Sequence, residues 1–199
     1  MIVQNRMTKN PETISPEEFL ASGLVEMHKG GFRRLPVVQD GKLIGIITDR
    51  DLREHAALLE QTKISAVMTK DLLTVTPRAT LEQAAKLMLS HKISGLPVTD
   101  AGQLVGVITT SDILQAFLDM LGASDERSFR IDFVLEEGHD LGLAANTIAE
   151  AGGEITGVGT HRDSWEASRV CYLHVRTTDR DRLVDALKTK GYTVLGVHV

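Results

Sequence analysis

The amino-acid sequence contains an internal repeat. A shift of 61 positions, which places Met7 on Met68, brings four separate segments into register without a gap. The matched segments are residues 7–9 with 68–70, 13–16 with 74–77, 35–37 with 96–98, and 41–48 with 102–109. A repeat of this length indicates two copies of one supersecondary unit, each with too little core to be stable alone. We therefore expect the two copies to fold together as one body.

Both copies show the same order of predicted elements, β-α-β-β-α. We expect the Ser15 and Thr76 hydroxyls to cap the first helix of each copy, with Pro16 and Pro77 in its first turn. Glycine-containing hairpin turns are predicted at residues 40–42 and 101–103. The other expected elements are strands 12–14 and 73–75, helices 17–29 and 78–90, strands 35–39 and 96–100, strands 43–47 and 104–108, and helices 49–59 and 111–121.

These linked motifs resemble a tandem of CBS domains, also called a Bateman module. The resemblance covers residues 1–122, with one repeat over 1–60 and the other over 61–122. It implies a mixed α/β (α+β) fold in which two small sheets face each other about a pseudo-twofold axis, accompanied by helices.

The chemistry of the repeat lies at a strand-to-helix junction. The pattern Gly-apolar-apolar-Thr-x-x-Asp occurs twice and pairs Thr48 with Asp51 and Thr109 with Asp112. A threonine hydroxyl and free N–H groups at a helix start can face a phosphate, and the carboxylate can accept two hydrogen bonds from a ribose diol. The resemblance implies the same roles, because in CBS tandems that bind adenine nucleotides this Thr and Asp contact phosphate and ribose. We therefore predict a site for AMP, ADP or ATP at each junction.

Other segments are expected to complete each nucleotide site. Backbone groups of Thr13 and Thr74 are predicted to read the edge of the base. The predicted walls for the flat base are the apolar first strand and the Leu-Pro-Val strand of each copy, with Leu35 and Pro36 in the first and Leu96 and Pro97 in the second. Arg34 and Gly95, which precede these leucines, are further predicted binding residues. The nearby cations are Arg33, Arg34, Arg50, His91 and Lys92. The sequence does not select which of them neutralises a phosphate.

Two other interpretations fit the same residues. Thr and Asp at a helix start are also ordinary N-caps, so capping alone can preserve the pattern. In that case the repeat pair is a dimerisation scaffold that is indifferent to nucleotide. A third interpretation is a site for another adenosyl compound, such as S-adenosylmethionine or a dinucleotide.

The last third of the chain predicts a second domain over 129–199, after a small and polar linker at 123–128. Its expected elements are strand 129–135, helix 141–151, strand 154–161, strand 168–176, helix 179–190 and strand 192–199. This β-α-β-β-α-β order is ferredoxin-like, and at this length it resembles an ACT domain. Many ACT domains bind an amino acid at the first strand-to-helix turn. That turn, 136–142, keeps Gly142 but lacks the family's proline, so amino-acid binding and an oligomerisation or coupling role both stay open.

A CBS tandem followed directly by an ACT-like domain resembles the acetoin-utilisation protein B (AcuB) family over nearly the whole chain. The resemblance implies a regulatory role in acetoin or acetyl-CoA metabolism. The expected assembly is a homodimer through the CBS pair, the ACT-like domain or both. The regulated protein is not identified by the sequence.

Composition and motifs narrow the classes of activity. A net charge of −5 argues against a nucleic-acid partner, which requires a basic surface. No apolar run approaches the ~20 residues of a membrane span, and the N-terminus lacks the apolar stretch of a signal peptide, so we expect a cytoplasmic protein with no membrane partner. Cys171, the single cysteine, lies in a predicted strand and is expected to be a buried structural thiol. Metal-spaced histidines, a nucleophile elbow and a P-loop are all missing, so we expect neither an enzyme nor a metal or cofactor.

Overall fold

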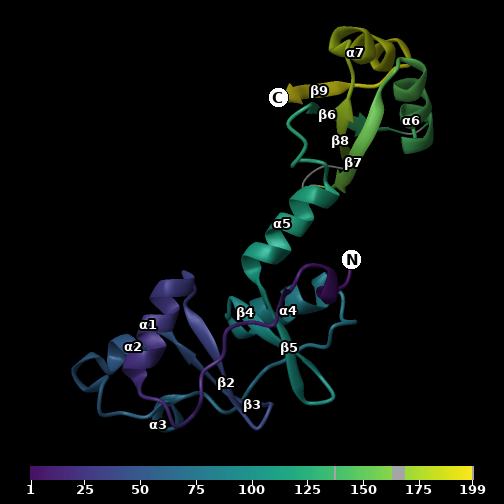
Figure 1. Ribbon diagram of the computed structural model, residues 1–199. Helices are drawn as coiled ribbons and strands as arrows, with labels where there is room; N and C mark the ends of the chain where they lie inside the picture. The colour runs from purple at the N-terminus through teal and green to yellow at the C-terminus, as the bar shows by residue number, and fades with distance from the viewer. Residues whose placement is uncertain (137, 163–168, 199) are drawn as a thin grey trace. The chain divides into compact units, whose positions relative to one another are not determined.

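The computed structural model describes residues 1–136, 138–162 and 169–198, which divide between two compact units (Figure 1). The units are Met1–Ile113 and Leu114–Val199. The first carries nearly all of both sequence repeats, and the second contains the ferredoxin-like domain. The predicted turn residues 163–167 and the predicted strand ends at Ser168 and Val199 lie outside the described residues.

The first unit confirms the mixed α/β fold and the repeated order of elements. Its elements are η1 (Val3–Asn5), β1 (Thr8–Lys9), α1 (Leu20–Gly30), β2 (Arg34–Gln39), β3 (Lys42–Thr48), α2 (Asp49–Glu54), η2 (Ala56–Leu58), α3 (Ile64–Val67), α4 (Leu81–His91), β4 (Gly95–Asp100), β5 (Gln103–Thr109) and α5 (Thr110–Met120). The unit boundary falls within α5, after Ile113.

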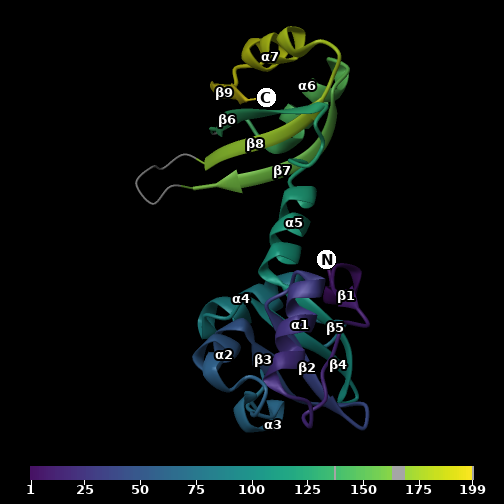
Figure 2. The same cartoon turned by 60° about the vertical axis from the view of Figure 1, so that its left-hand side comes forward.

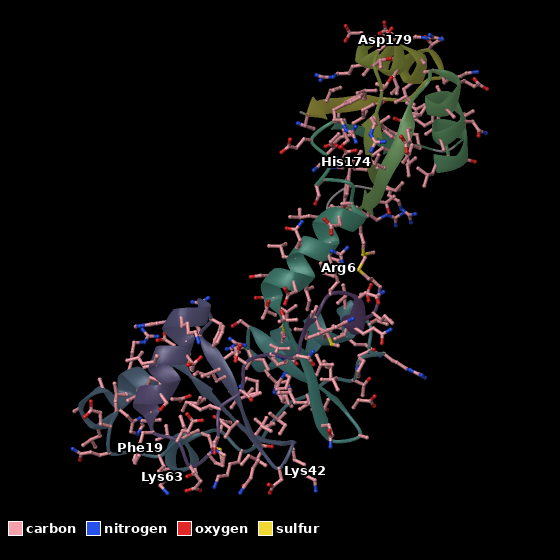
Figure 3. The ribbon with its side chains drawn as sticks, in the orientation of Figure 1. Arg6, Phe19, Lys42, Lys63, His174 and Asp179 are labelled. Carbon is pink, nitrogen blue, oxygen red and sulfur yellow. The ribbon has the colours of Figure 1, made fainter. Side chains whose placement is uncertain are left out.

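Each repeat contributes one antiparallel hairpin, β2 with β3 and β4 with β5. The Leu35–Ile47 pair of the first hairpin corresponds to the Leu96–Ile108 pair of the second. All four side chains are buried, because they lie on the core face of their strands. The hairpins are joined near their tips, where Lys42, labelled in Figure 3, pairs with the first residue of β5.

Both hairpins turn through two residues whose φ angles are positive. These angles are 50° at Asp40 and 77° at Gly41 in the first hairpin, and 48° at Ala101 and 81° at Gly102 in the second. Positive φ at both turn positions is the requirement of a type I′ turn, whose twist matches that of the flanking strands. The two predicted hairpin turns are therefore confirmed.

The first residues of each repeat pack against the other repeat. The Val3 N–H donates to the Ala79 carbonyl, 2.8 Å away and just before α4, so the N-terminal segment lies beside that helix (Figure 1). In the same way, the Ile64 N–H donates to the Glu18 carbonyl at 2.8 Å. Ile64 is fully buried in a cluster with Leu20 of α1. Both repeats thus build each half of the unit.

The short strands predicted at 12–14 and 73–75 are reduced to single β-bridges. In the first repeat only Ile14 pairs, in parallel with Val37 of β2, and the equivalent single bridge forms in the second repeat. The neighbouring Pro36 of β2 has no N–H, so it cannot donate to a longer ladder. The strand predictions are therefore wrong in length.

Both first helices begin later than the Ser-Pro and Thr-Pro steps predict. The N-cap of α1 is Phe19, which makes no side-chain cap and is labelled in Figure 3. The N-cap of α4 is Thr80, which exchanges hydrogen bonds of 3.2 and 2.9 Å with Gln83 in a capping box. The Ser15 N–H donates instead to the Glu18 carboxylate at 3.0 Å, in a turn ahead of the helix. The predictions of Ser15 and Thr76 as caps are wrong, because both residues lie in turns that precede the helices.

The second helices of the repeats differ in length. The α5 helix has 11 residues and matches the helix predicted at 111–121 to within one residue. The α2 helix has only six residues and ends at Glu54. Its C-cap is His55, whose Nδ1 lies 2.9 Å from the Asp51 carbonyl. The chain continues as η2, so the helix predicted at 49–59 is shorter than expected.

The second unit has the ferredoxin-like order that the sequence predicts. Its elements are β6 (Ser128–Leu135), α6 (Leu141–Glu150), β7 (Glu154–His161), β8 (Arg169–Arg176), α7 (Arg180–Thr189) and β9 (Val194–His198). The strands form an antiparallel sheet in the order β7-β8-β6-β9, and Figure 2 shows both helices on one side of it. The strand side chains buried under the helices are Phe129, Ile131, Phe133, Cys171, Leu173 and Val175. Asp179, labelled in Figure 3, caps α7 by accepting a hydrogen bond of 3.1 Å from the Arg182 N–H.

Gly157 marks the place where β7 meets the C-terminal end of α5. A side chain at this position would collide with the Leu121 carbonyl. The pairing of β7 with β8 also shifts register between Ile155 and Gly157. A glycine inside a strand permits such a close backbone approach, which explains the glycine in this segment of the sequence.

Candidate functional site

Two cavities of similar size lie in the first unit. The Thr109 cavity, of about 470 Å³, is lined by residues 8, 10–12, 31–34, 36, 94, 107 and 109–111. The Thr48 cavity, of about 490 Å³, is lined by residues 33, 34, 46, 48–50, 53, 69, 71–73, 92–95 and 97. The shift of 61 positions converts most of one lining into the other.

Each cavity combines segments from both repeats. The Thr109 cavity takes its lead-in segment, the residues 8–12 that precede the first helix, and its β2 wall from the first repeat. It takes its Thr-containing junction from the second repeat. The Thr48 cavity takes these parts from the opposite repeats. The arrangement follows from the exchange of lead-in segments, which carries the chain past the junction of the partner repeat. The repeat therefore produces one site twice.

The Thr-x-x-Asp residues form a capping box at the first junction. The Thr48 hydroxyl donates to Asp51 Oδ2 at 2.6 Å, and the Thr48 N–H donates to the same oxygen at 2.7 Å. The Asp51 N–H donates back to Thr48 Oγ1 at 3.4 Å. Capping is thus a real role of this motif, as one of the alternatives expects.

The second junction repeats the geometry almost unchanged. The corresponding distances from Thr109 to Asp112 Oδ2 are 2.7 Å for the hydroxyl and 2.8 Å for the N–H, and the returning bond is 3.3 Å. In the described part of the chain, the other carboxylate oxygen, Oδ1, accepts no hydrogen bond at either Asp51 or Asp112. Both threonines also line open cavities. The cap therefore coexists with space for a ligand.

Arg34 lines both cavities and lies over a glycine of the other repeat. Its Nη2 donates to Ser94 Oγ, and a side chain at Gly95 would collide with its Nη1. Gly95 is the residue that corresponds to Arg34 in the second repeat, so one arginine uses the space that its counterpart leaves empty. A single guanidinium therefore contributes to the walls of two sites.

The electrostatic surroundings of Arg34 favour an anion nearby. Burial lowers the pKa of the Arg34 guanidinium from its ordinary value, and the like charge of Arg33 lowers that pKa further. Among the described residues, no carboxylate forms an ion pair with Arg34. A half-buried cation without a counterion is costly, because it loses hydration without gaining an opposite charge. A ligand with a phosphate or carboxylate in either cavity would offset this cost.

Of the six predicted binding residues in β2 and β4, Arg34 and three others line a cavity. Pro36 lines the Thr109 cavity, and Gly95 and Pro97 line the Thr48 cavity. Leu35 and Leu96 are instead buried in the core, on the opposite face of the same strands. The alternation of side chains along a strand separates these leucines from the neighbouring wall residues.

Four further predicted binding residues line neither cavity. The exposed residues Thr13 and Thr74 are flanked by Glu12, which lines the Thr109 cavity, and by Leu73, which lines the Thr48 cavity. Asp51 and Asp112 also lie outside both linings, although the threonine that each of them is hydrogen-bonded to lines a cavity. A contact from any of these four to a nucleotide stays a prediction.

The suggested cations divide between the cavities. Arg33 and Arg34 line both, whereas Arg50 and Lys92 line only the Thr48 cavity. His91, which precedes Lys92, lines neither of them.

Several lining residues were missed by the sequence analysis. They are Thr8, Asn10, Pro11, Ser94, Thr110 and Ser111 in the Thr109 cavity, and Asp49, Arg53, Thr69, Asp71 and Leu72 in the Thr48 cavity. The available signal was the register itself, which relates Asn10 to Asp71 and Thr8 to Thr69. That signal becomes useful only when the exchange of lead-in segments is known.

The turn that precedes α6 is organised by its own residues. Asp140 Oδ1 accepts a hydrogen bond of 2.8 Å from the Leu143 N–H, and the Tyr192 hydroxyl donates to the Asp140 carbonyl at 2.7 Å. Gly142 lies two residues after Asp140, in the first turn of α6. Glu137 of the predicted turn lies outside the described residues. The observed bonds hold the helix start and do not point to a ligand.

The single cysteine is a buried thiol, as the sequence predicts. Cys171 is fully buried in the second unit, and burial raises the pKa of its thiol to about 11, with a smaller contribution from the charge of Asp132. The thiol therefore stays protonated at neutral pH. Within the described ranges, we find no cluster of three or more potential metal ligands. No helix in those ranges is both long and apolar enough to cross a lipid bilayer.

Comparison with known proteins assigns the repeat pair to a family. The CBS domain family matches residues 3–58 and 64–119. The Bacillus subtilis CBS domain-containing protein YhcV is 38% identical over 116 residues, which cover 56% of this chain and 81% of YhcV. The inosine-5′-monophosphate dehydrogenase of Staphylococcus epidermidis is 35% identical over 156 residues, but the match spans only 31% of that enzyme.

Three solved structures share the fold of the repeat pair. A Vibrio cholerae protein assigned to acetoin utilization (AcuB) is 34% identical and superposes with a TM-score of 0.57, covering 63% of this chain and 96% of that one. The CBS pair of MJ0100, in complex with 5′-methylthioadenosine and S-adenosyl-L-methionine, is 28% identical with a TM-score of 0.56 over 63% of this chain and 98% of that one. CBSX2, in complex with AMP, is 31% identical with a TM-score of 0.53 over 59% and 96%.

Proposed function

Because this chain belongs to the CBS-domain family, we propose that it is a regulatory protein that senses adenine nucleotide in the Thr48 and Thr109 cavities. The bound state is transmitted through oligomer or partner contacts. The AMP complex of CBSX2 and the adenosyl complexes of MJ0100 support this proposal, because both relatives share the fold of the repeat pair.

The observation that carries the proposal is the half-buried Arg34 between two open cavities. Its guanidinium has no carboxylate partner among the described residues, and both cavities reach it. A nucleotide phosphate would supply the missing anion and could accept paired hydrogen bonds from the planar guanidinium. Nucleotide binding accounts for an unpaired cation at this position, whereas a scaffold that binds no ligand gives no reason for it.

The cavities also suit the other parts of a nucleotide. Their volumes of about 470 and 490 Å³ lie in the range of small-molecule sites. Apolar wall atoms come from Pro36 and Val107 in one cavity and from Ile46 and Pro97 in the other, and these can contact a flat base. The Thr48 and Thr109 hydroxyls offer polar contacts in the same cavities, and the sugar and phosphate of a nucleotide need such hydrogen bonds.

A thermal-shift titration with AMP, ADP and ATP tests the proposal. Purified chain freed of co-purified nucleotide should gain about 2.7 kcal/mol of stability at a ligand concentration one hundredfold above Kd, because the ligand binds only the folded state. Adenine-free controls, such as inorganic phosphate at equal concentration, should give a much smaller shift. The absence of a shift with every adenine nucleotide would leave the scaffold interpretation.

A second candidate ligand class is an uncharged or cationic adenosyl compound. The specific observation in its favour is the MJ0100 pair, which was solved with 5′-methylthioadenosine and S-adenosyl-L-methionine. Competition of these compounds against AMP separates the two candidates. If either compound displaces bound AMP at a concentration below the Kd of AMP, the second class is favoured.

The proposal extends to the ferredoxin-like domain and to the pathway. We infer that the second unit is ACT-like and supports a homodimer, because its sheet order β7-β8-β6-β9 leaves β7 and β9 as edge strands that can pair with another copy. The likeness to the Vibrio cholerae AcuB protein supports a role in acetoin metabolism. Sedimentation equilibrium of the full chain tests the dimer, and a monomer at micromolar concentration would contradict it.

A further inference from the structure

We propose that the two cavities take ligands of different charge. The Thr48 cavity binds a nucleoside di- or triphosphate, and the Thr109 cavity binds an adenosyl ligand with at most one phosphate. This inference rests on the proposed function and adds to it the class of ligand for each cavity.

The charged residues of the two linings are unequal. The charged residues that line the Thr109 cavity are Glu12, Arg33 and Arg34. The Thr48 cavity contains the same two arginines and three further cations, Arg50, Arg53 and Lys92, with the two acids Asp49 and Asp71. The Asp49 carboxylate is already paired with Arg53 at 2.9 Å. The Thr48 cavity therefore has an excess of positive charge that a single phosphate would not balance.

The difference comes from positions at which the repeats diverge. Arg50 corresponds to Ser111, and Lys92 corresponds to Gly31, so two cations of the Thr48 cavity are replaced by uncharged residues in the Thr109 cavity. Glu12 corresponds to an apolar leucine. Because the volumes are nearly equal, charge and not size distinguishes the two sites. Electrostatic complementarity of this kind gives specificity between ligands of similar shape.

The backbone conformation of Lys92 is a second observation that points to a functional role. It is the C-cap of α4 and has a φ of 55°, in the left-handed region where glycine is favoured. The equivalent C-cap of α1 is Gly31, with a φ of 67°. A lysine at this position adopts a backbone conformation that costs stability, and strained residues of this kind concentrate at functional sites. A phosphate contact in the Thr48 cavity explains why a lysine stands where the first repeat has glycine.

Substitution by the residue of the other repeat tests the proposal. Calorimetric titrations of the full chain with ATP, AMP and 5′-methylthioadenosine, without magnesium, should be compared between the natural chain and the variants Arg50→Ser and Lys92→Gly. Each variant should weaken ATP binding by about tenfold, a typical loss for one charge-assisted contact, and leave 5′-methylthioadenosine within about twofold. ATP affinity should also fall with added salt more steeply than that of 5′-methylthioadenosine.

Lys92→Gly gives a readout that a structural role would not produce. The variant should raise the melting temperature of the ligand-free protein, because glycine relieves the positive φ, while it weakens ATP binding. The matched control is Lys86→Ala, which removes an exposed cation of the same helix outside both cavities. The control should change ATP affinity by less than about twofold, since exposed distant charges are screened. A Lys92→Gly variant that keeps full ATP affinity would overturn the proposal.

The reverse substitution separates this inference from the proposed function. Ser111→Arg adds the missing cation to the Thr109 cavity and should create a second ATP site in the titration. If AMP, ATP and 5′-methylthioadenosine all fail to bind the natural chain, the proposed function is wrong and this inference falls with it. If they bind, but each fills both cavities equally and Ser111→Arg changes nothing, only the assignment of ligands is wrong.

Discussion

The two CBS repeats agree in their hairpins and junctions and diverge at their cavity walls. The Thr-to-Asp hydrogen bonds differ by about 0.1 Å between the repeats. By contrast, Arg34 of the first repeat corresponds to Gly95, and Lys92 of the second corresponds to Gly31. Shared positions therefore maintain the fold, and unshared positions on the cavity walls give each site its own chemistry.

Gly45 and Gly106, the glycines that begin the two Gly-apolar-apolar-Thr patterns, are equivalent in the two repeats. Their surroundings differ, which makes the comparison testable. A side chain at Gly45 would approach Met68 Sδ to 2.5 Å, and one at Gly106 would approach the equivalent Met7 Sδ to 2.6 Å. At Gly106 the added atom would also come within 2.9 Å of the Thr8 backbone carbonyl. A methionine side chain can move aside, whereas a backbone carbonyl that belongs to the β1–β5 pairing cannot move freely.

The largest expected effect is therefore that of Gly106→Ala. We expect it to lower the free energy of unfolding by about 2–3 kcal/mol, because the methyl group displaces β1, and Gly45→Ala to cost only about 1 kcal/mol. Urea denaturation of both variants measures the difference. Equal losses would show that the methionines, and not the β1 backbone, limit the space at the junction.

The next effect concerns the arginine that serves both cavities. Arg34→Ala should weaken ATP binding at the Thr48 cavity and AMP binding at the Thr109 cavity by about tenfold each, because each ligand loses the same phosphate partner. The ligand-free variant should be no less stable than the natural chain, since the change removes a half-buried cation without a counterion. Two-site calorimetry measures both affinities. Loss at one cavity alone would refute the shared role of Arg34.

A smaller effect distinguishes the first helices of the repeats. Thr80→Ala should lower the free energy of unfolding by about 1 kcal/mol, because it removes the cap bonds to Gln83 at the start of α4. Thr80→Ser keeps the hydroxyl and should restore most of the loss. Phe19 makes no side-chain cap at the start of α1, so Phe19→Ala has no cap bond to lose. A stability loss in Thr80→Ser as large as in Thr80→Ala would contradict the capping contribution.

Much of the fold could be predicted because it depends on local patterns. The strand at 154–161 is observed with the predicted bounds, and the hairpin turns follow from glycine at the second turn position. The late helix starts and the short helices η1 and α3 were missed, because tertiary hydrogen bonds, such as that of Ile64 to Glu18, set them. Such contacts join residues far apart in sequence and leave no local pattern.

The site was predicted less completely than the fold. The register identified Thr48 and Thr109, which do line the cavities, because a repeated motif is visible in one sequence. It could not show that Leu35 faces the core while Pro36 faces a cavity, since the direction of a side chain depends on which strand face is buried. The contribution of Arg34 to both sites depends on the space above Gly95, which only the three-dimensional packing reveals.

The smallest expected effect lies in the hairpin turns. Ala101 and Asp40 occupy equivalent positions with φ values of 48° and 50°, but alanine has no polar side chain to stabilise the left-handed conformation. Ala101→Asn should therefore raise the free energy of unfolding by about 0.5–1 kcal/mol, and Asp40→Ala should lower it by a similar amount. Thermal unfolding of both variants measures the two shifts. Because the turns lie outside both cavities, nucleotide affinity should stay unchanged in each variant, so a change in affinity would mean that the hairpin tips are coupled to the binding sites.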